Sequence, residues 1–296
     1  MLKDFFGKTQ DEKKRNIVRI IYLTVTVILI LSVALAITLA VGQNGNDGAS
    51  GDDTSDASGT VLKPTLSDTK KGTLLVVNSQ SNAFDFTVNS EKSLVSISNN
   101  SNLYSLKTEG MKANKEALAA LNKMLGDFYK QAGASEKKVT IYTAYRSFED
   151  QGKLLNSSVP AGNSDFHTGM LFELTIDGTA TSIKSDSAFN WIYENAYKYG
   201  FVDRYPIGKS SYTGVSDFDN AFRYVGTPHA KYMKDNNLCL EEYVSRVQTA
   251  TEPIMADGYK ITYVKANTEG NTEIPLSSKA YSISGDNMGG FIVASK

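Results

Sequence analysis

The feature that most limits the fold of this chain is an uncharged apolar run near its start. Residues 20–41 read IIYLTVTVILILSVALAITLAV and contain no Asp, Glu, Lys or Arg. At 1.5 Å per residue, a helix of this length crosses a hydrocarbon core of about 30 Å. The run therefore predicts one transmembrane helix over residues 20–41.

The charges on either side of the apolar run predict its orientation. Lys13, Lys14, Arg15 and Arg19 precede the run, whereas no Lys or Arg follows it until Lys63. By the positive-inside rule, residues 1–19 form a cytoplasmic tail and the main domain is extracellular, so the protein is a single-pass protein of the cell membrane. The alternative is a cleaved signal peptide, but its apolar region would span only about 7–15 residues.

The residues after the predicted helix divide the rest of the chain into three parts. Residues 42–60 are Gly, Ser, Asp, Asn, Thr, Ala and Gln with no aromatic or aliphatic side chain larger than that of Ala, so we expect a flexible linker. A main domain is expected over residues 61–250. Residues 251–296 contain the apolar runs GYKITYVKA and YSISGDNMGGFIVAS, which predict a C-terminal β extension.

Apolar spacing predicts the main elements of an α+β domain. Helices are expected over residues 113–132, 147–155, 189–199 and 240–247, and strands at TLLVVNS (73–79), AFDFTV (83–88) and KVTIYTA (138–144). Gly133 and Gly200 are placed where the first and third of these helices would end.

Composition excludes several classes of function. Lys and Arg total 31 against 32 for Asp and Glu, so net charge predicts no nucleic-acid partner. The single cysteine excludes an internal disulfide and a Cys-rich zinc module. Only two histidines, His167 and His229, are available as imidazole ligands.

Three blocks of sequence carry a specific resemblance. They are YTAYRSFEDQ (142–151), SDFHTGMLFEL (164–174) and ENAYKYGFVDRYPIGKSSYTGVSDFDNAFRYVGTPHA (194–230). Their order and spacing resemble the zinc D-alanyl-D-alanine carboxypeptidases of the VanY type, whose zinc-site architecture also underlies the Hedgehog signalling domain. The resemblance implies a small antiparallel sheet flanked by helices.

The resemblance also implies where a zinc ion and a general base would be held. In the family, the zinc ligands correspond to Phe166, Glu173 and Ala221 of this chain, and the general base corresponds to Phe218. A catalytic zinc site needs three protein donors and an open position for water, and an aromatic ring or a methyl group offers no donor. We therefore predict no catalytic residue and no bound metal, although zinc is expected in active family members.

The residues that would bind substrate in the family are retained. Arg146 matches the arginine that faces the substrate peptide, and Gln151 and Ser164 resemble polar residues of the same cleft. The alternatives are a scaffold salt bridge for Arg146 and a turn or helix cap for Ser164. His167 and His229 are expected to be structural rather than metal ligands.

A carboxylate-only site is a further alternative at the former metal position. Asp217 and Asp219 flank Phe218, and together with Glu173 they could bind Ca²⁺ or Mg²⁺. A solvated loop is the favoured interpretation of these acids.

Two functions follow from these features. The first is a catalytically inactive, membrane-anchored relative that binds a peptidoglycan stem peptide or a cell-wall protein. The alternative is an active D-alanyl-D-alanine carboxypeptidase with a rearranged metal site. Fold resemblance alone does not decide between them, because activity depends on the residues of the site.

Overall fold

The computed structural model describes residues 60–78, 82–131, 134–154, 157–177, 187–216, 218–276 and 281–296, except for the side chains of 187–189. All of them belong to one compact unit that spans Ser58–Lys296. The predicted cytoplasmic tail, transmembrane helix and nearly all of the linker lie outside these residues. Within the described part of the chain, no helix is both long and apolar enough to cross a membrane.

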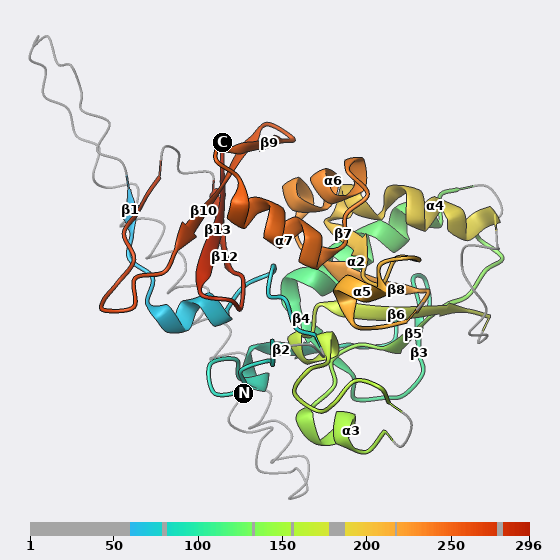
Figure 1. The fold of residues 1–296 in the computed structure, drawn as a ribbon. Helices are drawn as coiled ribbons and strands as arrows, with labels where there is room; N and C mark the ends of the chain where they lie inside the picture. Colours follow the sequence, from blue (N-terminus) through green and yellow to red (C-terminus); the bar gives the residue numbers. More distant parts are fainter. Residues whose placement is uncertain are drawn as a thin grey trace, which may run out of the picture. The chain divides into compact units, whose positions relative to one another are not determined.

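A five-stranded sheet forms the centre of the main domain (Figure 1). Its strand order is β3 (Ser105–Leu106), β5 (Val139–Thr143), β6 (Leu171–Ile176), β8 (Ala221–Tyr224) and β7 (Phe201–Asp203). The β3–β5 pair is parallel and the other pairs are antiparallel. The expectation of a purely antiparallel sheet was therefore wrong at this edge, because β3 reaches β5 through β4 and a helix rather than through a hairpin.

Helices surround this sheet and supply much of its core. They are α2 (Lys115–Phe128), α3 (Phe148–Gly152), α4 (Ser187–Asn195), α5 (Ser210–Thr213), α6 (Thr227–Asp235) and α7 (Leu240–Thr249). Asn114 is the N-cap of α2, and its side chain accepts from two backbone N–H groups. The helix buries Leu121, Met124, Leu125 and Phe128. This apolar face matches the spacing that predicted the helix.

Single-turn 3₁₀ helices and short strand pairs complete the main domain. The 3₁₀ helices are η1 (Leu66–Lys70), η2 (Glu91–Ser93), η3 (Asp165–Thr168) and η5 (Ala196–Tyr199). The short pairs are β1 (Val61–Leu62) with β11 (Ile274–Pro275), and β2 (Leu94–Ser96) with β4 (Lys112–Asn114). Gly200 ends η5 at a φ of 83°, as expected for a glycine at a helix end.

The C-terminal extension is a second sheet. Its strand order is β12 (Tyr281–Gly285), β13 (Gly290–Ser295), β10 (Tyr259–Lys265) and β9 (Ile254–Ala256), and all pairs are antiparallel. Helix α7 packs against β10, where Ile261, Ile292 and Ala294 share a core with Tyr243 and Val244. The extension is thus confirmed as a β unit.

Two segments that resemble strands in sequence form none in the structure. Residues 73 and 74 lie in a turn and residues 75–78 in no regular element, although Leu74 to Val77 are buried. The backbone atoms of this segment pair with side chains and with the Asp286 carbonyl instead of with a strand. Residues 83–88 form a turn in which the Asp85 carboxylate accepts from the backbone N–H of Thr87. Asp side chains favour such turns by competing for backbone donors.

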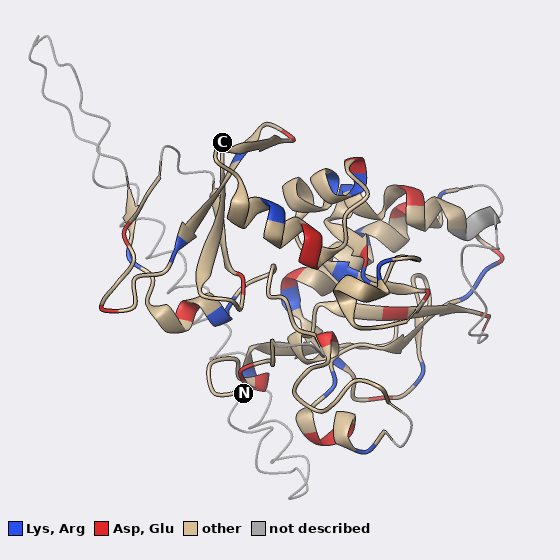
Figure 2. Cartoon of the chain, in the orientation of Figure 1, with Lys and Arg blue, Asp and Glu red and all other residues tan. Residues whose placement is uncertain are grey.

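Acidic and basic side chains are interspersed over the described elements (Figure 2). This distribution agrees with the formal net charge of −1.

Candidate functional site

Strands β6 and β8 bring two of the aligned positions face to face. Glu173 of β6 pairs directly with Ala221 of β8 in the antiparallel register. Phe166 lies in η3, which leads into β6 through Gly169. Gly169 has a φ of 69°, and a Cβ there would lie 2.7 Å from Leu94 Cδ2, so a side chain would displace η3 from the strand pair β2–β4.

An apolar cluster occupies the place where these elements meet. Phe166, Leu171, Tyr205 and Ala221 are buried in it, with Val215 and Phe218 packed against them. The ring centroid of Phe218 is 6.5 Å from that of Phe166 and 5.8 Å from that of Tyr205. The register of the resemblance thus brings Phe166, Glu173, Phe218 and Ala221 to one place in the fold.

The side chains at these four positions do not fit a zinc ion. Glu173 is the one member with an atom that can bind a metal, and zinc sites use three or four protein donors. Across the described ranges, no group of three His, Cys, Asp or Glu side chains could hold a metal ion. Asp217 lies outside those ranges, so a carboxylate-only site that includes it stays untested.

Glu173 is held as a partly buried carboxyl group. Its Oε2 accepts a hydrogen bond of 2.7 Å from the Thr143 hydroxyl. Burial raises the pKa of Glu173, whereas the Thr143 hydrogen bond and the charge of Arg146 act to lower it. The carboxyl group therefore lies within electrostatic reach of the predicted substrate-binding arginine.

Arg146 lies against the apolar cluster. Its guanidinium carbon is 4.5 Å from the centroid of the Phe166 ring, in the range of a cation–π contact, and its Nη1 donates to Gln151 Oε1 at 2.7 Å. Burial lowers the pKa of Arg146, while Glu173 opposes that change. Arg146 and Gln151 are therefore brought together beside Phe166.

The surroundings of Gln151 and Ser164 differ. Gln151 is buried, and its Nε2 donates to the Ser157 hydroxyl and to the Val159 carbonyl. Ser164 is buried at the N-cap position of η3, where its side chain makes no capping hydrogen bond. Ser164 therefore lies at the start of a single helical turn, which is the setting that its alternative interpretation as a turn residue describes.

Both histidines are buried and are held by hydrogen bonds within the domain. His167 Nε2 accepts from the backbone N–H of Gly162, and Nδ1 lies 2.6 Å from the Arg146 carbonyl oxygen, which makes Nδ1 the protonated nitrogen. Nδ1 of His229 lies 2.6 Å from the Tyr243 hydroxyl, and burial lowers the pKa of His229 to about 4. Neither ring belongs to the cluster around Phe166.

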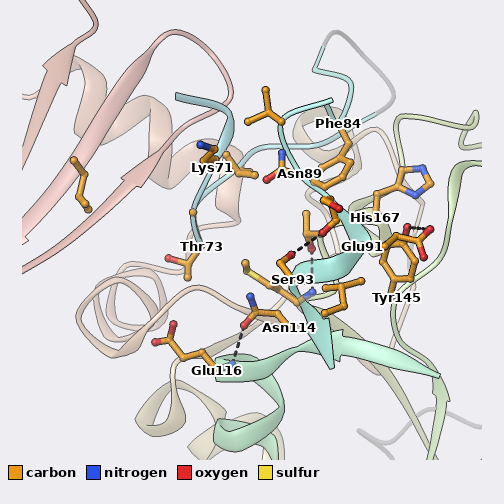
Figure 3. Close-up of a pocket in the computed structure, with 18 residues that line it drawn as sticks. Lys71, Thr73, Phe84, Asn89, Glu91, Ser93, Asn114, Glu116, Tyr145 and His167 are labelled. Carbon is orange, nitrogen blue, oxygen red and sulfur yellow. Dashed lines mark hydrogen bonds between the residues drawn. The ribbon is translucent and has the colours of Figure 1, made fainter. Parts of the chain in front are cut away.

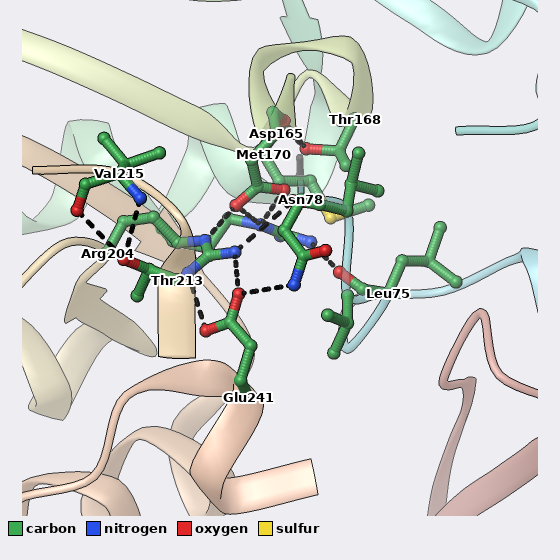
Figure 4. Close-up of polar contacts among 12 residues, drawn as sticks. Leu75, Asn78, Asp165, Thr168, Met170, Arg204, Thr213, Val215 and Glu241 are labelled. Atoms are coloured by element: carbon green, nitrogen blue, oxygen red, sulfur yellow. Dashed lines mark hydrogen bonds and ion pairs between the residues drawn. The ribbon is translucent and has the colours of Figure 1, made fainter. Parts of the chain in front are cut away.

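A buried charge network centres on Asp165, the sequence neighbour of Phe166 (Figure 4). Asp165, Arg204 and Arg223 have almost no solvent exposure. Asp165 accepts from Arg204 Nε at 2.5 Å and from Arg223 Nε at 3.1 Å, and Arg204 also pairs with Glu241 at 2.7 Å. Two cations and two carboxylates therefore compensate one another inside the domain.

The two arginines of the network also donate hydrogen bonds to backbone carbonyls of segment 73–78. Arg223 Nη2 donates to the Leu75 carbonyl and Arg204 Nη2 to the Val77 carbonyl, each at 3.4 Å. On the opposite side, the N–H of Leu74 donates to Ser284 Oγ at 2.8 Å, and Asn287 Nδ2 donates to the Val76 carbonyl at 2.9 Å. The C-terminal sheet is thereby connected, through segment 73–78 and the arginines, to Asp165 beside Phe166.

Sequence reasoning missed the role of this network. Arg204 and Arg223 lie within the blocks that carry the resemblance, but no role was predicted for them. The signal was two arginines among apolar residues of short strands, a setting in which a charge must be paired.

Comparison with known proteins yields consistent matches. Residues 110–227 match the family model described as VanY, D-alanyl-D-alanine carboxypeptidase. A D-alanyl-D-alanine carboxypeptidase of Enterococcus faecium is 31% identical over 234 residues, which cover 75% of this chain and 75% of that protein. A D-alanyl-D-alanine carboxypeptidase of Enterococcus faecalis is 32% identical over 118 residues, covering 39% of this chain and 43% of that protein.

A solved structure shares the fold. The vancomycin-resistance D,D-dipeptidase VanXYg, in complex with a D-Ala-D-Ala phosphinate analogue, superimposes with a TM-score of 0.67 at 24% identity. The match covers 79% of this chain and 98% of that chain. At this identity, the similarity bears on the fold alone.

Proposed function

This chain belongs to the VanY family of D-alanyl-D-alanine carboxypeptidases, and from this premise we propose that it is a non-catalytic member that binds a peptidoglycan stem peptide. The observation that carries the proposal is the apolar cluster of Phe166, Ala221 and Phe218 at the aligned metal and base positions. A phenyl ring cannot accept a proton as a general base must, and neither a ring nor a methyl group can bind a metal.

Packing supports the loss of catalysis. Phe166 is 4% exposed and Ala221 is 1% exposed. A metal and its water would need polar surroundings in the volume that these side chains fill. Burial of apolar surface stabilises the domain while it closes this part of the cleft.

Binding is supported by Arg146. A guanidinium is a rigid fork of donors suited to a carboxylate, and one of its donors is already oriented by Gln151. Stacking on Phe166 restricts the side chain further. The proposed ligand is therefore a peptide that presents its terminal carboxylate to Arg146. A cell-wall protein is the alternative partner.

The site of action is proposed from the sequence. The apolar run over residues 20–41 would anchor the chain in the cell membrane with residues 1–19 in the cytoplasm and the described domain outside. Protease digestion of intact cells tests this topology. Protection of the described domain until the cells are lysed would contradict it.

The first experiment tests activity. The full-length chain is incubated with a stem pentapeptide, with and without added zinc, while bound metal and released D-alanine are measured. We expect neither stoichiometric zinc nor turnover. Stoichiometric zinc together with D-alanine release would establish the alternative, an active carboxypeptidase with a rearranged metal site.

The second experiment tests whether the cleft geometry is intact. The combined variant Phe166→His, Glu173→Asp, Phe218→Glu, Ala221→His supplies three donors and a base on the observed strand register. We expect it to bind zinc, as measured by metal content and by a zinc-dependent rise in melting temperature. The variant Phe218→Glu alone is the control and is expected to bind none.

The third experiment tests peptide binding itself. Calorimetry with a peptide ending in D-Ala-D-Ala is expected to detect binding that Arg146→Ala weakens by about tenfold or more, because a charge-assisted hydrogen bond to the peptide carboxylate is lost. Arg146→Lys keeps the charge without the fork and should give an intermediate affinity. Equal affinity for all three proteins would refute this role of Arg146.

A further inference from the structure

A cavity of about 530 Å³ borders the two segments that carry Arg146 and Phe166 (Figure 3). Tyr145 and His167, the sequence neighbours of those two residues, line its wall. The other walls come from segment 71–75, from residues 84–94, from the start of α2, and from Ile283 of the C-terminal sheet. Its volume falls in the range of about 300–1,000 Å³ that is typical of small-molecule sites.

Close backbone packing forms the walls of this cavity. A Cβ on Gly72, which has a φ of 119°, would lie 2.3 Å from Ser284 Oγ of β12. The backbone N–H of Asn114 donates to the Gly169 carbonyl at 2.8 Å, which holds the start of α2 against η3. Backbone packing therefore fixes the parts of the wall around Gly72 and Asn114.

Two of the charged groups that line the cavity are paired with an opposite charge. Lys71 pairs with Asp68 at 2.8 Å, and Glu91 pairs with Lys112 at 3.1 Å. The Tyr145 hydroxyl also donates to Glu91 at 2.8 Å. Glu116 also lines the cavity and accepts from the Tyr224 hydroxyl at 2.7 Å, so the lining offers an anionic ligand no unpaired cation. An uncharged ligand therefore fits the cavity better than an anionic one.

Two amide side chains offer one donor and one acceptor. The Asn114 oxygen accepts from the backbone N–H groups of Glu116 and Ala117, so its amide nitrogen is the atom presented to the cavity. The Asn89 amide nitrogen donates to the Lys70 and Asp85 carbonyls, so its oxygen is presented instead. Such a pair matches the C=O and N–H of a secondary amide.

Apolar and aromatic side chains form a further part of the lining. Phe84, Val88, Leu94 and Ile283 supply apolar surface, and Tyr145 adds a second ring. A pyranose ring has hydroxyl groups around its edge and C–H groups on its faces, so it can contact rings and hydrogen-bonding groups together.

We propose that this cavity is a binding site for an uncharged, N-acetylated sugar of about two pyranose rings. The acetamido group pairs with Asn89 and Asn114, and the sugar faces lie against Phe84 and Tyr145. The proposal does not rest on the function assigned to the cleft, because none of these contacts uses Arg146 or the apolar cluster.

The test is calorimetric titration of the full-length chain in lipid nanodiscs, which avoid glycoside detergents. The probe is N,N′-diacetylchitobiose, with cellobiose as the matched sugar that lacks the acetamido groups. We expect saturable binding of the first with a Kd of about 1 mM or tighter, and at least about fivefold weaker binding of the second. A chitin tetrasaccharide that binds more tightly than the disaccharide would identify a glycan strand as the source of the sugar, whereas equal binding would identify a free disaccharide.

A matched pair of variants locates the site. Ser93 is exposed and lines the cavity, whereas the adjacent Lys92 is exposed and does not line it. We expect Ser93→Trp to weaken binding by at least about tenfold and Lys92→Trp to leave it within about twofold. No saturable binding up to about 20 mM, equal binding of cellobiose, or undiminished binding by a folded Ser93→Trp variant would overturn the proposal.

Discussion

Asp165 and Phe166 are neighbours in the chain, yet one belongs to a region of paired charges and the other to a region of apolar side chains. Asp165 lies at the centre of a fully buried network with two arginines and a glutamate. Phe166 lies in an apolar cluster where aligned family positions would bind a metal. One region pairs its buried charges with one another, and the other consists of apolar side chains.

The difference shows which part of the site the scaffold needs. The network holds β7, β8, α7 and segment 73–78 around η3, so its loss would leave buried charges without partners. The cluster joins η3, β6, β8 and the residue stretch after β7 through apolar contacts. The elements around η3 are therefore supported both by paired charges and by apolar packing.

The largest effect is expected from Asp165→Ala. This change leaves two buried guanidinium groups with one remaining carboxylate, Glu241, and should reduce the free energy of unfolding by about 3–5 kcal/mol. Urea denaturation measures the loss. Asp235→Ala, at the exposed pair with Lys231, is the control and should change stability by about 0.5 kcal/mol or less. Similar losses for both would mean that the network is not the main support.

A somewhat smaller effect is expected from Phe166→Ala. Removing a buried ring from the cluster should lower stability by about 3 kcal/mol, near the low end for buried phenylalanines, because the cluster is small. Phe148→Ala removes the same atoms from a side chain that is 55% exposed and should lower stability by less than about 1 kcal/mol. Thermal unfolding of the two variants distinguishes packing in the cluster from a general loss of aromatic surface.

His229 is a buried basic side chain outside both regions, and its partner is the hydroxyl group of Tyr243. Its pKa is lowered to about 4 by burial, so the folded state binds fewer protons than the unfolded state. The stability that His229 contributes is present above its ordinary pKa of 6.5 and is lost as pH falls through about 4. At about pH 5 the loss should be roughly 2 kcal/mol.

The variant His229→Gln isolates this contribution. Denaturant unfolding of the two proteins at about pH 7 and pH 5 gives the difference between their pH dependences. Parallel profiles for the wild type and the variant would show that His229 does not titrate on unfolding.

The smallest effect is expected from Glu173→Gln. Burial raises the pKa of Glu173, so the folded state favours the protonated form, and its contribution is full below an ordinary pKa of 4.5 and lost as pH rises through the raised value. The neutral amide can still accept from Thr143, so we expect a gain of about 1 kcal/mol at neutral pH. The gain should vanish below about pH 4.5, and a constant gain at every pH would indicate a packing effect instead.

Local patterns predicted much of the fold. The apolar spacing of residues 113–132 predicted α2, and Gly200 marked the end of η5. The register of the three blocks placed Glu173 beside Ala221 and Phe166 beside Phe218, although the sequence alone offered no distance between them. In these places, the residues that decide the structure are close in sequence or belong to a matched block.

The remaining features depend on distant partners. Segment 73–78 is rich in β-branched residues and resembles a strand, but it pairs with arginine side chains and with residues near 284. The cavity beside Tyr145 combines six separate parts of the chain, so no single stretch of sequence indicates it. The predicted membrane helix and its orientation lie outside the described residues and stay predictions.

The hydrogen bonds from segment 73–78 to Ser284 and Asn287 also constrain the order of folding. They join residues about 210 positions apart, and closing so long a loop is slow because its entropy must be lost before the contacts form. During synthesis, the support behind the cleft cannot be completed before residue 287 has emerged. A nascent chain halted ahead of that point would expose Leu74 and Val76 to chaperones and proteases.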